Sequence, residues 1–254
     1  MRNMKATLSS DKLRQWLPLG TLFILVTVVG VKQPVFLQPS TLLQLASDTA
    51  VLFILATGVT FVIMLGGIDL SIQSMASLAS VLVALTVAQL GHGAVVLAIA
   101  VGALAGLFSG LAHVWLKVPS FIATLAMGGV LFSTALVSSK ERSITLGDAD
   151  RSYQTWITGT IYGVPNVIVI GLIVLVVAHI LQAHTQFGRY SAAIGAGEPA
   201  AYASGVKVDR QKIFAYILSA SFAALAGVIL AGRLASGSPT LAAELLLPSI
   251  AAVS

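Results

Sequence analysis

The sequence predicts an all-α membrane protein that crosses the bilayer several times, and three observations support this fold class. Of the 254 residues, 57% are hydrophobic and only 9% are charged, whereas a soluble domain carries roughly a quarter charged residues. The mean hydropathy is +0.97. No segment alternates with period two over the length of a barrel strand, so helices are expected to satisfy the backbone in lipid.

The spans follow one another along the whole chain, since a bilayer core needs about 20 mostly apolar residues per helix. Seven complete spans are predicted, at residues 16–31, 42–65, 71–90, 93–116, 119–138, 164–183 and 213–235. Another apolar run opens at Leu245 and is unfinished at Ser254, so the chain is expected to be incomplete at its C-terminus. No soluble domain interrupts the series, and residues 1–254 are expected to form a single transmembrane domain.

The distribution of Lys and Arg predicts the orientation, because basic residues favour cytoplasmic loops. A basic leader precedes the first span, so the N-terminus is expected in the cytoplasm. Alternation then places residues 139–163 outside and 186–212 inside, with nine of the 14 basic residues inside. Three aromatic residues of the outer loop are expected to anchor it at the membrane interface: Tyr153, Trp156 and Tyr162.

Two stripes of small residues predict close helix packing. Gly102, Gly106 and Gly110 form the first, and Ala223, Gly227, Ala231 and Ala235 form the second. Packing within one chain is the simpler expectation for both stripes. Homodimerisation through one of them is the alternative.

Two carboxylates fall within or beside apolar stretches, where burying a charge is costly. Asp48 is expected near the outer interface. Asp69 follows Gly66 and Gly67 and precedes Ser71, a pattern typical of a helix N-cap beside a glycine break. Either the cap is purely structural, or this helix start lies beside a translocation pathway or gate.

Residues 186–212 form the longest polar and basic interruption in the C-terminal half. Phe187, Tyr190 and Ile194 recur at helical spacing, which predicts an amphipathic helix. Pro199 suits the start of a second short helix, and Gly205 suits the C′ position that ends it. This segment is expected either to dock a partner protein or to lie on the membrane surface.

Catalysis is not expected from this chain. Cysteine is absent and the four His residues form no HExxH pair, so no metal site or cofactor is predicted. The sequence also contains no GxSxG elbow and no phosphate-binding P-loop.

Three motifs resemble the membrane subunits of ribose-type ABC importers, the bacterial permeases for ribose, xylose, galactose and autoinducer-2. They are "TGVTFVIMLGGIDLSIQSM" (57–75), "KVPSFIATLAMGGVL" (117–131) and "FGRYSAAIGAGEPAAYASGVKV" (187–208). The resemblance extends from about residue 40 to the end, where "AGRLASGSPTLAAELLLPSIAAV" is similar to the lead-in of a further family block. Family members normally continue through additional spans.

The resemblance implies roles for two groups of residues. In the family, the counterpart of 187–208 is the cytoplasmic loop that docks the ATPase and is related to the EAA motif, although Pro199 occupies the place of the first EAA residue. The implied coupling residues are Phe187, Gly188, Arg189, Tyr190, Gly195, Glu198, Pro199, Ala200, Ala201, Tyr202 and Gly205. The implied pathway or gate residues are Gly67, Asp69, Ser71, Phe121 and Thr124.

The function expected on this basis is that of an ABC importer permease in the bacterial inner membrane, passing a small hydrophilic solute such as a sugar. The implied partners are an ATP-binding subunit, a second permease subunit and an extracytoplasmic solute-binding protein. Two other functions stay open. An ion-coupled secondary transporter would use Asp69 as its coupling charge, and a non-transporting scaffold would apply if the short form is natural.

Overall fold

A computed structural model describes the backbone of residues 2–147 and 151–253, and the side chains from Trp16 onward apart from Arg151. The chain divides into two compact units, Met1–Ala46 and Ser47–Ser254, with the boundary inside helix α2. The first unit contains α1 (Arg2–Lys32), the short 3₁₀ helix η1 (Pro34–Leu37) and the beginning of α2 (Pro39–Ile63). Within it, Leu37 packs on the bare backbone of Gly30.

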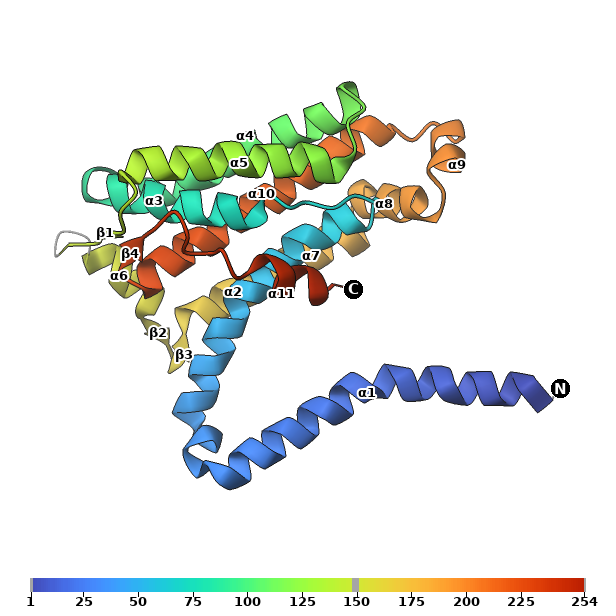
Figure 1. The fold of residues 1–254 in the computed structure, drawn as a ribbon, viewed down its shortest axis with the longest axis horizontal. Helices are drawn as coiled ribbons and strands as arrows, with labels where there is room; N and C mark the ends of the chain where they lie inside the picture. Colours follow the sequence, from blue (N-terminus) through green and yellow to red (C-terminus); the bar gives the residue numbers. More distant parts are fainter. Residues whose placement is uncertain (1, 148–150, 254) are drawn as a thin grey trace. The chain divides into compact units, whose positions relative to one another are not determined.

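Among the residues that the structure describes, the second unit contains the rest of α2 and nine further helices (Figure 1). The helices are α3 (Ile72–Leu90), α4 (Gly93–Trp115), α5 (Ser120–Ser139), α6 (Arg151–Thr158), α7 (Asn166–His184), α8 (Gln186–Ala196), α9 (Glu198–Ala203), α10 (Val208–Arg233) and α11 (Leu246–Ala251). The four strands are β1 (Ile144–Thr145), β2 (Thr160–Ile161), β3 (Val164–Pro165) and β4 (Ser236–Gly237).

Within the part of the chain whose side chains the structure describes, six of the seven predicted spans are present as helices of sufficient length and hydropathy. They are α2, α3, α4, α5, α7 and α10. The apolar part of the remaining one, Trp16–Lys32, is a shorter portion of α1. The polytopic helical class is therefore confirmed, and the chain is a multi-pass membrane protein.

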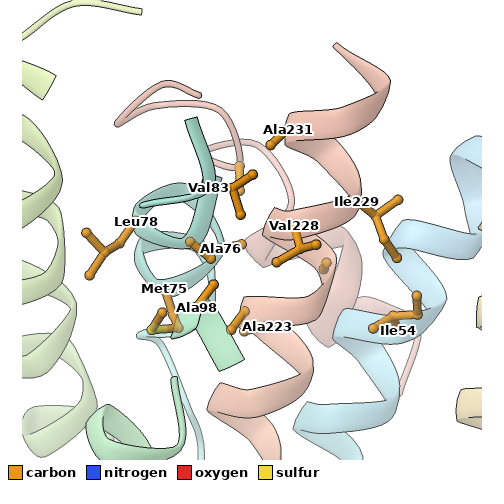
Figure 2. Close-up of a cluster of buried hydrophobic side chains, with 14 of the residues drawn as sticks. Ile54, Met75, Ala76, Leu78, Val83, Ala98, Ala223, Val228, Ile229 and Ala231 are labelled. Carbon is orange, nitrogen blue, oxygen red and sulfur yellow. The ribbon is translucent and has the colours of Figure 1, made fainter. Parts of the chain in front are cut away.

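The core of the second unit lies around α10, which packs against α3 and α4 (Figure 1). Ala76 of α3, Ala98 of α4 and Ala223 of α10 are completely buried in it. Ile54 of α2 faces Ile229 of α10 within the same cluster (Figure 2). Small side chains fill the centre, so the helix backbones approach one another closely.

Both small-residue stripes are used for packing within the chain. A Cβ atom on Gly102 would lie 2.7 Å from the carbonyl oxygen of Ala220, and one on Gly106 would collide with the carbonyl of Tyr216. Gly227 of α10 lies equally close to the carbonyl of Ala76 in α3. The intramolecular interpretation is correct at these positions, because neighbouring helices of the same subunit already occupy the space beside the glycines.

One short hairpin, one pair of strands that are distant in the sequence, and α6 lie at one end of the bundle. β2 pairs antiparallel with β3 around Tyr162 and Gly163, which both have positive φ, as a type I′ turn requires. β1 pairs with β4, placing Ile144 opposite Gly237. This pairing fixes the segment that follows α10 beside α3.

The predicted aromatic anchors of the outer loop do not behave alike. Tyr162 is fully exposed and Trp156 is partly exposed, in contact with His92. Tyr153 is completely buried and its hydroxyl donates to the carbonyl oxygen of Val228. Burial raises the pKa of the Tyr153 phenol, so its ionisation is even less favourable than that of an exposed tyrosine. The expectation of an interfacial anchor is therefore wrong for Tyr153, because α6 packs on α10.

Asp48 has a partner that the sequence did not predict. The guanidinium of Arg233, at the end of α10, forms an ion pair with the Asp48 carboxylate and donates to the carbonyl oxygen of Ser47 at 3.3 Å. The Asp48 side chain is 54% exposed. A half-exposed Asp48 paired with the last residue of α10 agrees with the expected position near an interface.

Candidate functional site

The candidate site begins where α2 ends, at residues 64–71, which we call the α2–α3 connection. Gly66 has a φ of +76°. Its amide donates to the carbonyl of Ile63, and the Gly67 amide donates to that of Val62. This is a Schellman motif, in which glycine supplies the left-handed conformation that stops a helix. The Gly-Gly pair thus ends α2 and turns the chain.

The connection is extended and fastened to the first turn of α5. The Ile68 amide donates to Oγ of Ser120 at 3.1 Å, and the Leu70 amide donates to Oγ1 of Thr124 at 3.1 Å. The Thr124 hydroxyl is buried and donates in turn to backbone carbonyls, including that of Ile68 at 3.3 Å. Two hydroxyls of α5 therefore replace the hydrogen bonds that a helix would have provided.

Asp69 is buried at the centre of the connection, with 1% of its surface exposed. Its Oδ1 accepts from the Ser71 amide at 2.9 Å and from the Ser71 hydroxyl at 2.6 Å. Its Oδ2 accepts from Oγ of Ser219 at 2.8 Å. Ser219 lies roughly three turns into α10, so the connection reaches well into the bundle.

The predicted N-cap role of Asp69 is wrong in its geometry. The residue that precedes α3 is Ser71, and it makes no side-chain capping bond. Asp69 instead closes an Asx turn onto Ser71 while its second oxygen binds α10. Its carboxylate joins two elements that are far apart in the sequence.

Tyr216, about one turn before Ser219 on α10, contacts the same connection. A Cβ atom on Gly67 would lie 2.7 Å from the Tyr216 hydroxyl, so the tyrosine tip occupies the space left by the glycine. The Tyr216 ring also packs edge-on against His113 of α4, with ring centroids 5.8 Å apart. His113 is held by a 2.8 Å hydrogen bond between Nδ1 and the Val118 carbonyl. Tyr216 thus links α4, α10 and the connection.

A groove of about 310 Å³ begins at the connection and runs between α3, α5 and the segment after β4. Its lining consists of Leu70, Gln73, Ser74, Ser77, Leu125, Gly128, Gly129, Phe132, Pro239 and Ala243. Ser77 and Ser80 hold the segment after β4 in place by accepting from the amides of Ala242 and Ser238. The groove therefore combines amide and hydroxyl groups with one aromatic ring, inside a largely apolar protein.

We call residues 186–205, which form α8 and α9, the coupling segment. Its inner side is buried: Phe187 packs edge-on against Phe61 of α2 at 5.5 Å, and Ile194 is 3% exposed. A Cβ atom on Gly188 would collide with the carbonyl of Gln182 in α7. The predicted amphipathic helix is present, but its apolar face contacts protein.

Tyr190 and Tyr202 mark the outer side of the coupling segment. Tyr202 is 74% exposed and Tyr190 is 39% exposed. Arg189 is exposed as well, as are Ala200 and Glu198. This surface therefore combines two tyrosines with one basic, one acidic and one small side chain.

α9 has the boundaries that the sequence predicted. Pro199 lies in its first turn. Gly205, with a φ of +81°, donates to the Tyr202 carbonyl, and Val206 donates to that of Ala201, completing a second Schellman motif. Nζ of Lys212 lies 2.8 Å from both carboxylate oxygens of Glu198, which fastens α9 to α10.

The structure brings together four of the five predicted pathway residues: Gly67, Asp69, Ser71 and Thr124. Phe121 is 49% exposed beside them on α5. The sequence interpretation missed Ser219, Tyr216 and Ser120. Their only sequence signal is that small hydroxyl and tyrosine side chains recur inside or at the start of otherwise apolar spans.

Residues 41–253 match the family described as "Branched-chain amino acid transport system / permease component". The chain belongs to this permease family. It is accordingly a membrane permease subunit, built from the helices described above.

Curated members of the permease family are similar over most of the chain. The ribose import permease protein RbsC of Bacillus subtilis is 38% identical over 93% of this chain and 74% of its own length. RbsC of Escherichia coli K12 is 34% identical over 91% of this chain and 74% of its own length. The fructose import permease protein FrcC of Rhizobium meliloti is 31% identical over 86% of this chain and 63% of its own length. No solved structure gives a significant match.

Proposed function

We propose that this permease is the membrane subunit of an ABC importer for a sugar or sugar-like solute, driven by ATP that a partner subunit hydrolyses. The observation that carries the proposal is the 38% identity to a ribose import permease over 93% of the chain. The fructose import permease adds a second sugar among the relatives. The family match over residues 41–253 includes the connection, the groove and the coupling segment.

The chemistry of the groove suits such a solute. Gln73, Ser74 and Ser77 offer hydrogen-bond donors and acceptors of the kind that bind hydroxyl groups, and Phe132 offers an apolar ring face. None of these four side chains carries a charge, which favours a neutral polyol over an ion.

The same groove supports a second permease subunit as a partner. Leu125 at its edge is 61% exposed, so the groove is open to the outside of this chain. Lipid cannot satisfy the hydrogen bonds of amide and hydroxyl groups. A second copy, or a related subunit, would cover the groove and complete a polar pathway.

The coupling segment supports an ATPase as the second partner. Its inner face is buried against α2 and α7, so it forms a firm attachment, while Tyr202 projects outward. Exposed aromatic side chains are frequent interface anchors. On this proposal the coupling segment and the N-terminus lie in the cytoplasm, and an extracytoplasmic solute-binding protein delivers the solute at the opposite end.

The buried carboxylate of Asp69 is the feature on which ion-coupled transport would depend. Three donors from Ser71 and Ser219 already satisfy it. A carboxylate saturated in this way braces two elements, and that role requires no coupling ion. The hydrogen bonding of Asp69 is therefore as consistent with an ABC importer as with an ion-coupled transporter.

Uptake by cells that express the permease with its ATPase and binding protein tests the proposal. Labelled ribose and fructose are the probes. We expect uptake to stop when ATP is depleted while ion gradients are kept constant. We expect Tyr202→Ala to reduce recovery of the ATPase with the purified permease, and Thr155→Ala, on the opposite loop, to leave recovery unchanged. Uptake that persists without ATP and follows an ion gradient would show a secondary transporter instead.

A further inference from the structure

The coupling segment and the α2–α3 connection touch each other directly, although neither motif suggests this in the sequence. A Cβ atom on Gly195 of α8 would lie 2.5 Å from the carbonyl oxygen of Met64, the first residue after α2. We infer that Gly195 is a positioning residue, through which movement of the coupling segment is passed to the connection that holds Asp69. The inference rests on the proposed function, because it needs an ATPase to move the segment.

The contact between Gly195 and Met64 is suited to transmit movement because it joins two backbones. A side chain can change rotamer and absorb a displacement, whereas a helix backbone against a backbone carbonyl cannot. Met64 also lies within the Schellman motif that runs from Val62 to Gly67, so any shift of Met64 moves the start of the connection.

Neighbouring contacts keep α8 and the end of α2 together. Phe187 packs against Phe61 at 5.5 Å, and Ile194 is buried in the same cluster as Phe61, Val62 and Leu65. Displacing α8 without displacing this end of α2 would expose the apolar side chains that meet between them. The two elements are therefore expected to move as one body.

The coupling segment is fastened to α10 as well. Lys212 binds Glu198, and Nε2 of Gln211 donates to the Phe187 carbonyl at 2.7 Å. Further along α10, Tyr216 contacts Gly67 and Ser219 binds Asp69. The coupling segment thus contacts the end of α2 and α10, the two elements that meet at the connection. A change in the position of α10 relative to the end of α2 would alter the geometry of the Asp69–Ser219 hydrogen bond.

Two alanine variants on the coupling segment distinguish the Gly195–Met64 contact from a general effect of replacing glycine by alanine in this segment. Gly195→Ala puts a methyl group against the Met64 carbonyl, although alanine favours the helix by itself. Gly197→Ala is the matched control: its φ is 173°, which any residue adopts, and its new methyl group would lie 3.9 Å from Cβ of Ala200.

The readout is the accessibility of the connection in the assembled complex with the ATPase. The chain contains no cysteine, so Ile68→Cys, at a position that is 45% exposed, provides its only thiol. Its labelling rate is measured with and without ATP. We expect ATP to change the rate in the Ile68→Cys protein and in the Gly197→Ala background, and we expect this change to be lost in the Gly195→Ala background.

Two results overturn the inference. One is an unchanged labelling rate on ATP addition in the protein that retains Gly195, a measurement that does not depend on how the variants fold. The other is an ATP response that survives in Gly195→Ala. Recovery of the ATPase with the permease, measured on the same samples, tests the proposed function separately: with no recovery the importer itself is wrong, whereas recovery without an ATP response refutes only the role of Gly195.

Discussion

Oγ of Ser219 donates a 2.8 Å hydrogen bond to Oδ2 of Asp69, joining residues that are 150 positions apart. Both residues are almost completely buried, with 1% of their surfaces exposed. This bond connects the middle of α10 to the extended segment between α2 and α3. A buried acceptor that loses its donor costs more than a normal hydrogen bond contributes, so the bond fixes how these elements meet.

Ser219→Ala is expected to lower the free energy of unfolding by about 1–3 kcal/mol, because Oδ2 of Asp69 would stay buried without a donor. Thermal unfolding of the purified permease in detergent measures the change. Ser221→Ala is the control on the same helix, since its hydroxyl binds only the Ile217 carbonyl one turn earlier. Equal losses of stability in the two variants would show that the Asp69–Ser219 hydrogen bond contributes no more than a hydrogen bond within one helix.

Asp69→Asn is expected to retain the fold and most of the uptake. The Asn carbonyl oxygen accepts from Ser71 as Oδ1 does now, and the Ser219 hydroxyl can accept from the new amide, since a hydroxyl both donates and accepts. Asp69→Ala loses all three hydrogen bonds and is expected to unfold more easily. An Asn variant that folds normally but takes up no solute would point to a needed charge and favour ion coupling.

The orientation is tested by single cysteines at two exposed serines, Ser152 and Ser204. An impermeant thiol reagent applied to intact cells is expected to label Ser152→Cys only, because the coupling segment is proposed to be cytoplasmic. Lysed cells are expected to show labelling of both. Ser191 is unsuitable for this test because it is completely buried. Labelling of Ser204→Cys in intact cells would reverse the proposed topology.

Gly106→Ala is expected to destabilise the permease by about 1–3 kcal/mol through overpacking. The added methyl group would collide with the Tyr216 carbonyl, so α4 and α10 would have to separate. Gly93→Ala, in the first turn of the same helix, brings its methyl group only to 3.6 Å from Cβ of Leu90 and is expected to be tolerated. The unfolding temperatures of the two variants provide the comparison.

Gly205 is expected to accept Asn better than Val. Its φ of +81° is a conformation that Asn adopts more readily than a β-branched residue, and a Cβ atom there meets nothing within 4 Å. Backbone strain at Gly205, in the turn that ends α9, is therefore the expected cause of a difference. We expect Gly205→Val to reduce ATPase recovery more than Gly205→Asn does. Identical recovery would show that the shape of α9 does not govern docking.

The sequence by itself determined the features that depend on composition and on neighbouring residues. Hydropathy over about 20 residues located the spans, and six of them are present as full-length helices. The left-handed preference of glycine located the end of α9 at Gly205, since a helix stop is a local event. The order of the three motifs along the chain also indicated the permease family, and the similarity to other permeases confirms this family.

The tertiary structure alone decided which distant groups meet. Asp69 looked like a helix cap from its neighbours, but its second oxygen is bound by Ser219. Tyr153 looked like an interfacial anchor, but it is buried where α6 packs on α10. The approach of Gly195 to Met64 is equally invisible in the sequence. The periodicity of a helix shows how apolar its face is. It does not show whether lipid or protein covers that face, because both are apolar. The packing of α10 against its neighbours decides which faces protein covers.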